Sequence, residues 1–257
     1  MKNLKKLSLL AASALLAVAF LAAGCGSDSA SSGSSSKNTT VTVGATPVPH
    51  GEILNEIKPL LAKEGVDLKV VEFTDYVKPN LALNDKELDA NFFQHSPYLD
   101  KFNSEHGTKL KAIAKIHVEP MGIYSHKIKD LKDLPDGAKV AIPNDPTNGG
   151  RALLILQSAG LIGLKDGGNI TSTVQDVEKN DKHLQFVELE AAQIPRSIDD
   201  VDIALINTNF AMEAGLNPLK DALFLEPKDS PYANVLVVRE GDENRPEIQK
   251  LVKALQS

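Results

Sequence analysis

Apolar positions along residues 39–257 follow two periods that alternate along the chain. At residues 41–43 and 66–70 every second side chain is apolar, which predicts half-buried strands. Between these two segments, apolar residues recur at helical spacing over residues 53–61. Strand and helix patterns in alternation predict an α/β fold.

Three later segments are short and apolar throughout, at residues 140–142, 203–206 and 235–238. Continuous apolar runs of this length are typical of strands that are covered on both faces, as in parallel sheets. Residues 151–158 carry apolar side chains at helical spacing and are followed by Gly160, a residue type that often ends a helix. We therefore expect largely parallel sheets with helices packed against them.

The N-terminus has the pattern of a secretory leader. Lysines occupy positions 2, 5 and 6, residues 7–23 are almost wholly apolar, and the small residues 22–24 precede Cys25. The apolar run is shorter than the roughly 20 residues of a comfortable membrane span, so cleavage is the better interpretation. The pattern resembles the lipobox of bacterial lipoproteins, which predicts removal of residues 1–24 and a lipid on Cys25. The alternative is an ordinary secretory signal, and the single cysteine excludes an internal disulfide.

Residues 25–39 are rich in serine and poor in apolar side chains, which predicts a flexible tether. The whole chain has a formal net charge of −6, and removal of residues 1–24 would take away three lysines and no acid, leaving −9. Nucleic acids bind basic surfaces, so this acidic protein is not expected to bind them. We expect the folded part to be held by its lipid anchor at the extracytoplasmic face of the cell membrane.

Polar residues follow three of the predicted strands, at the carboxyl ends where ligands bind in open α/β sheets. The segments are 91–98, 143–151 and 207–209. In the second segment two prolines and two glycines predict a tight turn before a helix, whose N-terminus would present free N–H groups. Arg151 adds a cation there that suits a carboxylate or a phosphate. These three strand ends form the candidate ligand site.

Four motifs occur in one order along the chain: residues 91–99 (NFFQHSPYL), 143–153 (PNDPTNGGRAL), 205–209 (LINTN) and 230–235 (SPYANV). Together they resemble the methionine-binding lipoproteins of ABC importers, the NlpA/MetQ family. The resemblance implies a two-lobed α/β fold of the periplasmic-binding-protein type (type II), with the ligand cleft between the lobes. Lobe 1 would hold residues 40–122 and 230–257, and lobe 2 would hold residues 123–229.

The resemblance also implies roles for individual residues. Arg151 would bind the α-carboxylate of an amino acid, and Asn207 and Asn234 would hydrogen-bond its head group, because amides donate and accept without adding charge. Four ring side chains would line the pocket for the methionine thioether: Tyr76, Phe93, His95 and Tyr98. Taken alone, Phe93 and Tyr98 are equally typical of a core, and asparagine often serves turns.

The sequence lacks the motifs of a serine hydrolase, a phosphate loop or a dinucleotide-binding loop, so no enzyme activity is expected. His50, His95 and His117 lack the spacing of metal ligands, and the acidic residues 199–202 lack the pattern of a calcium loop. We therefore expect neither a metal nor another cofactor.

The most specific hypothesis is a substrate-binding lipoprotein that captures methionine outside the membrane. It would deliver methionine to an ABC permease driven by its ATPase. With the same fold, the ligand could instead be D-methionine, a methionine-containing dipeptide or another amino acid. A surface adhesin or receptor, and an enzyme built on the same fold, are further alternatives.

Overall fold

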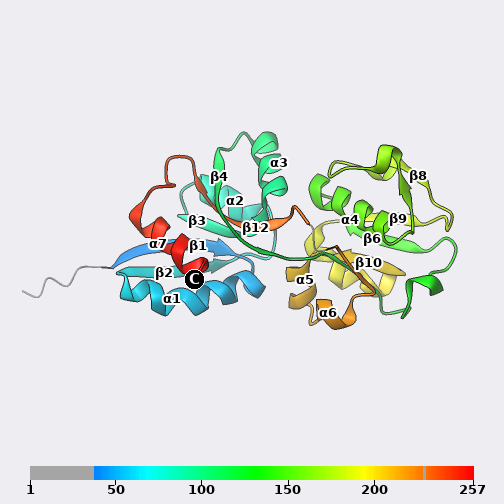
Figure 1. Ribbon diagram of the computed structural model, residues 1–257, viewed down its shortest axis with the longest axis horizontal. Helices are drawn as coiled ribbons and strands as arrows, with labels where there is room; N and C mark the ends of the chain where they lie inside the picture. The colour runs from blue at the N-terminus through cyan, green and yellow to red at the C-terminus, as the bar shows by residue number, and fades with distance from the viewer. Residues whose placement is uncertain (1–37, 228–229) are drawn as a thin grey trace, which may run out of the picture. The chain divides into compact units, whose positions relative to one another are not determined.

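The computed structural model describes residues 38–227 and 230–257, so the expected leader, Cys25 and residues 26–37 of the tether lie outside the described residues. Two five-stranded sheets, each packed with helices, dominate this part of the chain (Figure 1). We call the first sheet and its helices lobe 1, and the second sheet and its helices lobe 2. The prediction of a two-lobed α/β fold is confirmed.

Lobe 1 combines the N-terminal part of the described chain with its C-terminal segment (Figure 1). Its strands lie in the order β2-β1-β3-β12-β4. In chain order, the elements of lobe 1 are β1 (Thr39–Ala45), α1 (Glu52–Lys63), β2 (Val66–Glu72), α2 (Lys78–Asn84), β3 (Ala90–His95), α3 (Ser96–His106), β4 (Leu110–Val118), β12 (Ala233–Arg239) and α7 (Pro246–Leu255).

Both faces of the lobe 1 sheet are covered by helices, as the interior strand β12 illustrates. Leu236 and Val238 pack in an apolar cluster with residues of α1 and α7. Val235 and Val237 point to the other face and pack with residues of α2 and α3. Full burial of such a side chain favours folding by about 1.5–3 kcal/mol relative to exposure, which is why this strand is apolar at every position from 235 to 238.

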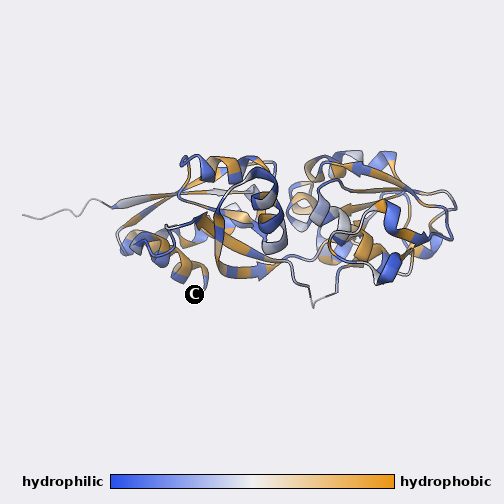
Figure 2. Ribbon diagram, turned by 90° about the horizontal axis from the view of Figure 1, so that it is seen from above, coloured by the Kyte–Doolittle hydropathy of each residue, from blue (hydrophilic) through white to orange (hydrophobic). Residues whose placement is uncertain are grey.

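Lobe 2 contains the middle of the chain, and its main sheet has the strand order β11-β5-β10-β6-β9. A separate two-stranded ladder pairs β7 with β8. Figure 2 shows apolar residues along the strands of both sheets and polar residues along the connecting loops. In chain order, the elements of lobe 2 are β5 (Gly122–Tyr124), β6 (Lys139–Pro143), α4 (Pro146–Ser158), β7 (Gly163–Leu164), β8 (Val177–Lys179), β9 (Gln185–Leu189), the 3-10 segment Ala191–Asp200, β10 (Ile203–Ile206), α5 (Thr208–Glu213), α6 (Pro218–Asp221) and β11 (Phe224–Leu225).

Both main sheets are mixed, so the expectation of largely parallel sheets is wrong. In lobe 1, β1 pairs in parallel with β2 and β3, but β12 pairs antiparallel with β3 and β4. In lobe 2, β6 pairs in parallel with β9 and β10, but β5 pairs antiparallel with β10 and β11. A continuous apolar run indicates burial on both faces of a strand, and it does not specify the direction of the neighbouring strands.

The chain passes between the lobes twice. The first crossing, residues 119–121, joins β4 to β5, and the second joins β11 to β12. Since β5 begins at Gly122, the second sheet starts just before the expected division after residue 122. Every helix of the described residues is too short or too polar to cross a membrane.

Candidate ligand-binding site

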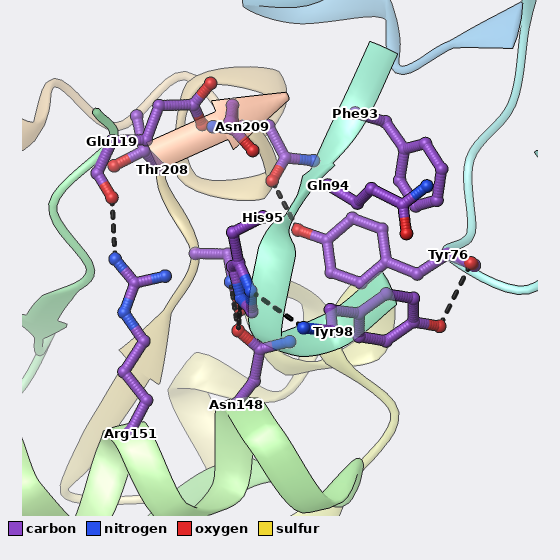
Figure 3. Close-up of a pocket in the computed structure, with 12 residues that line it drawn as sticks. Tyr76, Phe93, Gln94, His95, Tyr98, Glu119, Asn148, Arg151, Thr208 and Asn209 are labelled. Atoms are coloured by element: carbon purple, nitrogen blue, oxygen red, sulfur yellow. Dashed lines mark hydrogen bonds between the residues drawn. The ribbon is translucent and has the colours of Figure 1, made fainter. Parts of the chain in front are cut away.

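A pocket between the lobes lies at the carboxyl ends of β3 and β10 and at the first turns of α3, α4 and α5 (Figure 3). About 340 Å³ of space that protein atoms do not fill lies in and around it, part of it open to solvent. The seven side chains nominated from the sequence all line it: Tyr76, Phe93, His95, Tyr98, Arg151, Asn207 and Asn234. The structure thus brings these side chains together, while their individual roles stay predictions.

Lobe 1 supplies an aromatic wall. The ring centroid of Tyr76 lies 5.7 Å from that of Phe93 and 5.8 Å from that of Tyr98. The centroids of Phe93 and Tyr98 are 6.2 Å apart. Phe210 of lobe 2 does not line the pocket but packs against this wall, with its ring centroid 4.8 Å from that of Tyr76. Aromatic pairs at these separations favour tilted and edge-to-face arrangements, which fix the ring positions.

His95 is the last residue of β3 and caps the helix that follows. Its Nδ1 accepts a hydrogen bond of 3.1 Å from the backbone N–H of Tyr98, which places the Tyr98 ring beside the pocket. With Nδ1 as acceptor, the proton of the neutral ring sits on Nε2, which donates to Oδ1 of Asn148 at 3.2 Å. Burial, and secondarily the Arg151 charge, lower the pKa of His95 to about 3. The ring is therefore neutral at pH 7.

Lobe 2 supplies a wall of amides. Asp145 caps α4 by accepting the backbone N–H of Asn148 at 2.9 Å, and Oδ1 of Asn148 accepts a hydrogen bond of 2.9 Å from Nδ2 of Asn207. Oδ1 of Asn207 is buried, and it has no hydrogen-bond partner among the described residues. A buried acceptor without a partner is costly, so this atom is suited to a ligand N–H group.

Helix α4 begins earlier than the sequence suggested. It starts at Pro146, so Arg151 lies in the second turn and not at the helix N-terminus. Gly149 and Gly150 are inside the helix and do not form a turn before it. A Cβ atom at Gly150 would lie 2.3 Å from the carbonyl oxygen of Ile170, so glycine is needed there for close packing.

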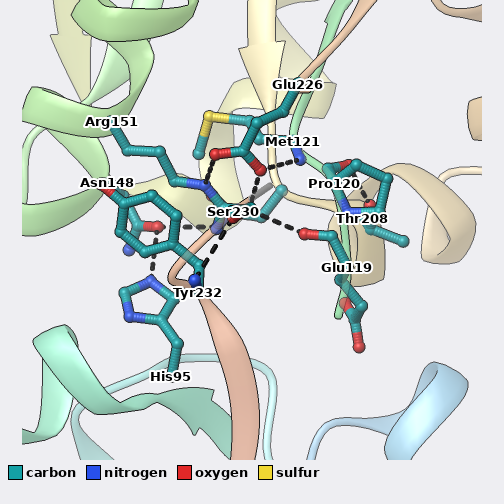
Figure 4. A network of polar contacts seen from close by, with 11 residues as sticks. His95, Glu119, Pro120, Met121, Asn148, Arg151, Thr208, Glu226, Ser230 and Tyr232 are labelled. Carbon is teal, nitrogen blue, oxygen red and sulfur yellow. Dashed lines mark hydrogen bonds and ion pairs between the residues drawn. The ribbon is translucent and has the colours of Figure 1, made fainter. Parts of the chain in front are cut away.

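Arg151 is buried and already paired with an acid (Figure 4). Its Nε donates to Oε1 of Glu226 at 2.9 Å, and its Nη2 donates to Oε2 of Glu226 at 2.5 Å. Nη2 also donates to the backbone carbonyl of Glu119 at 2.7 Å. The guanidinium therefore contacts both crossings, since Glu119 lies on the first and Glu226 on the second. Within residues 38–227 and 230–257, Nη1 makes no hydrogen bond.

An aromatic ring from the second crossing covers the same guanidinium (Figure 4). The carbon Cζ of Arg151 lies 4.2 Å from the ring centroid of Tyr232, a distance that allows a cation–π contact. Burial raises the pKa of Tyr232 to about 12. The ring is therefore uncharged, and the positive charge of Arg151 is balanced by Glu226.

Direct hydrogen bonds join the two lobes across the pocket. The hydroxyl of Tyr76 donates to Oδ1 of Asn209 at 2.5 Å, and the His95–Asn148 contact described above is the second such bond. Burial raises the pKa of Tyr76 well above its ordinary value, so the hydroxyl keeps the proton that it donates. The hydroxyl of Tyr98 donates to the backbone carbonyl of Tyr76 at 3.0 Å and supports this arrangement from within lobe 1.

Several pocket residues were not nominated from the sequence. Four of them lie inside the quoted motifs and could have been found there: Gln94, Asn148, Thr208 and Asn209. Glu119, which also lines the pocket, and Glu226, which pairs with Arg151, lie on the crossings, where no motif was recognised. Both residues interact with Arg151, and these interactions depend on the folded chain, which brings the two crossings together.

Two α/β lobes joined by two crossings, with a polar and aromatic pocket between them, define a protein of the substrate-binding class of transport systems. A sequence model of the NlpA lipoprotein family matches residues 41–257. The chain therefore belongs to the NlpA lipoprotein family.

Curated relatives and solved structures agree with this assignment. The D-methionine-binding lipoprotein MetQ of Escherichia coli is 51% identical over 206 residues, which cover 79% of this chain and 76% of the relative. A nutrient-binding protein of Burkholderia cenocepacia, solved bound to methionine, is 49% identical with a TM-score of 0.82, covering 84% of this chain and 92% of that one. A periplasmic substrate-binding protein of an ABC transporter from Coxiella burnetii is 48% identical with a TM-score of 0.81, again covering 84% and 92%.

Proposed function

We propose that this chain is the substrate-binding lipoprotein of an ABC importer and that it binds methionine in the pocket between its lobes. The observation that carries the proposal is the division of the pocket into a ring-lined wall and an amide and guanidinium wall. A free amino acid with an apolar side chain has a matching division between its head group and its side chain. The methionine-bound relative from Burkholderia cenocepacia supports this choice of ligand.

The head group of the ligand would lie against lobe 2. Nη1 of Arg151 would donate to the α-carboxylate, because Nε and Nη2 are engaged by Glu226 and Glu119. Oδ1 of Asn207 would accept from the α-ammonium group, which would give that buried oxygen a partner. Asn234 lines the same pocket and would complete the polar contacts.

The methionine side chain would lie against the aromatic wall. Tyr76, Phe93 and Tyr98 present ring edges and faces to the pocket, and thioether sulfur gains about 0.3–1.5 kcal/mol from each such contact. His95 is neutral and adds a ring to this wall without adding a charge. The wall thus suits an uncharged, polarisable side chain.

Delivery of the ligand would take place at the membrane. In this proposal Cys25 carries the lipid that holds the protein at the extracytoplasmic face, and an ABC permease with its ATPase accepts methionine from the pocket. The protein would bind and release its ligand without making or breaking a bond, as do the substrate-binding proteins that it resembles.

Calorimetric titration of the purified protein with a panel of ligands tests this function. The panel contains L-methionine, D-methionine, a methionine-containing dipeptide, L-alanine and inorganic phosphate. We expect saturable binding of one equivalent of a methionine stereoisomer, with thermal stabilisation that grows with ligand concentration. Preferential binding of the dipeptide or of L-alanine would replace methionine by that ligand, and the absence of binding to every amino-acid ligand would overturn the transport proposal.

A further inference from the structure

Three side chains that can ligate metals converge at the first crossing between the lobes. His50 lies in the turn Pro47–Gly51 before α1, His117 lies near the end of β4, and Glu119 directly follows that strand. Ligand atoms from all three lie within 4.8 Å of one another. His50 and His117 are far apart in the sequence, so their spacing gave no sign of this cluster.

One carboxylate oxygen is the point on which both imidazoles converge. Nε2 of His117 lies 2.6 Å from Oε1 of Glu119 and is hydrogen-bonded to it. Nε2 of His50 lies 3.1 Å from the same oxygen, but the angles of that approach do not make a hydrogen bond. Among the described residues, this fully buried nitrogen and the buried Nδ1 of His117 have no hydrogen-bond partner. A buried ring nitrogen that lies 3.1 Å from a carboxylate oxygen and has no hydrogen bond leaves its lone pair available to a cation bound by that carboxylate.

Thr46 gives His50 the support that metal-binding histidines usually have. The hydroxyl oxygen of Thr46 lies 2.7 Å from Nδ1 of His50. A histidine that ligates a metal commonly donates its second ring N–H to such an oxygen, which leaves the lone pair of the other nitrogen for the ion.

We propose that Nε2 of His50, Nε2 of His117 and the carboxylate of Glu119 bind a divalent transition-metal ion of the Zn²⁺ type. Two imidazoles and a carboxylate are characteristic zinc ligands, and three protein ligands leave one position for water or another ligand. Around a tetrahedral zinc ion, ligand atoms are about 3.4 Å apart, so the 2.6 Å separation between Nε2 of His117 and Oε1 of Glu119 would widen by about 0.8 Å on metal binding. The His117 side chain is 25% exposed, which gives the ion a route to the site.

The surrounding charges are compatible with this ion. Glu119 contributes one negative charge to the site, and the nearby positive charge of Arg151 is paired with Glu226. The backbone carbonyl of Glu119 accepts a hydrogen bond from Arg151 of lobe 2, while its carboxylate is held by His117 of lobe 1. A metal ion on Glu119 would therefore stiffen the crossing at the point where it contacts both lobes.

The test is a titration of the chelator-treated mature protein, without a histidine tag and without methionine, with ZnCl₂. We expect one equivalent of Zn²⁺ to bind, and we expect His50→Gln and His117→Gln each to weaken binding at least 100-fold. Thr46→Val should weaken it by about 10- to 100-fold, as removal of a hydrogen-bond partner of a metal-bound histidine does. His183→Gln is the matched control, because His183 is exposed and pairs with Asp136. This variant should bind Zn²⁺ as the parent protein does.

Cobalt provides a readout of geometry, since Co²⁺ in a four-coordinate histidine and carboxylate site gives visible absorption bands that His117→Gln should abolish. Far-UV circular dichroism checks that each variant is folded. If His50→Gln does not fold, the Zn²⁺ affinity of His117→Gln alone tests the proposed site. The absence of Zn²⁺ binding, or Zn²⁺ binding that both folded histidine variants retain, would overturn the proposal. Because methionine is absent from these titrations, failure of the metal site leaves the transport function untouched.

Discussion

The two lobes face one pocket with different chemistry. Lobe 1 presents the rings of Tyr76, Phe93 and Tyr98, whereas lobe 2 presents the guanidinium of Arg151 and the amides of its helix starts. The difference follows from the local folds. In lobe 1 the pocket continues an apolar cluster formed by Phe93, Tyr98 and Phe102. In lobe 2 it lies at the first turns of α4 and α5, where side-chain amides bond to one another.

This contrast explains how recognition of the ligand and contact between the two lobes can depend on each other. A ligand that fits only one wall gains the interactions of one lobe, whereas an amino acid with a long apolar side chain contacts both. Tyr76 and His95 already reach lobe 2 through hydrogen bonds to Asn209 and Asn148. On the proposed function, the ligand adds its own contacts to these bonds, so that binding energy is used to hold the lobes together.

The largest expected effect comes from the charge on the lobe 2 side. Arg151→Met should weaken methionine binding by about 2–5 kcal/mol, because the ligand carboxylate would lose its cationic partner in a buried site. The single variant also leaves Glu226 buried and unpaired, which destabilises the fold. The double variant Arg151→Met with Glu226→Gln removes both charges, and calorimetry on it measures the loss of binding more cleanly.

Glu226→Gln alone is the control for this prediction. It keeps the guanidinium and removes only the acid that balances its charge, so methionine affinity should stay the same or increase. If Glu226→Gln weakened binding as much as the double variant, Arg151 would act by holding the two crossings together and not by binding the carboxylate. Unchanged affinity in the double variant would remove Arg151 from the ligand site.

A smaller effect is expected on the pH dependence of folding stability, through the imidazole of His95 in the lobe 1 wall. Since the folded-state pKa of His95 is about 3 and its ordinary value is 6.5, the unfolded chain takes up a proton between these pH values that the folded protein does not. The contribution of His95 to stability is therefore complete above pH 6.5 and is lost as the pH falls toward 3. At pH 5 the loss is roughly 2 kcal/mol. Urea unfolding from pH 4 to 7 measures it as the difference between the parent and His95→Asn.

The direction of the pH dependence of stability distinguishes a buried histidine from an exposed histidine that is paired with an acid. His183 is exposed, and its hydrogen bond to Asp136 raises its pKa, so its contribution is present at low pH and is lost as the pH rises through that raised value. His183→Asn should thus alter the pH profile weakly and in the opposite direction. If His95→Asn left the acid dependence of stability unchanged, the His95 ring would be protonated or solvated in the folded protein.

Much of this arrangement could be predicted from local sequence, because local patterns determine local elements. The apolar run at 235–238 predicted a strand covered on both faces, and the polar residues after 142 and 206 marked the strand ends that form the pocket. Strand direction and the start of α4 were missed. The helix begins at Pro146 because Asp145 caps it, and the two glycines that suggested a turn serve close packing instead.

Contacts that depend on two distant segments could not be predicted from local patterns. Glu226 pairs with Arg151 across 75 residues, and His50 meets Glu119 across a similar separation. Glu226 and Glu119 lie on the two crossings, where no motif was recognised, so their roles are determined by how the chain passes twice between the lobes. The fold could therefore be predicted more completely than the charge balance of the site.

The smallest expected effect tests whether the aromatic wall recognises sulfur. Norleucine replaces the thioether of methionine by a methylene group and leaves the head group unchanged, so the parent protein should prefer methionine by about 0.3–1.5 kcal/mol for each sulfur–ring contact. Phe93→Leu should reduce this preference while leaving the contacts with lobe 2 in place. Competition calorimetry with methionine and norleucine measures the preference directly.

Phe102→Leu is the matched control, because Phe102 belongs to the same apolar cluster as Phe93 but does not line the pocket. Both variants remove a buried ring and should lower the thermal unfolding midpoint, yet only Phe93→Leu should change the ratio of methionine to norleucine affinity. An equal change of that ratio in both variants would mean that general loosening of lobe 1 sets the preference. An unchanged ratio in Phe93→Leu would assign sulfur recognition to the other rings of the wall, which are those of Tyr76, His95 and Tyr98.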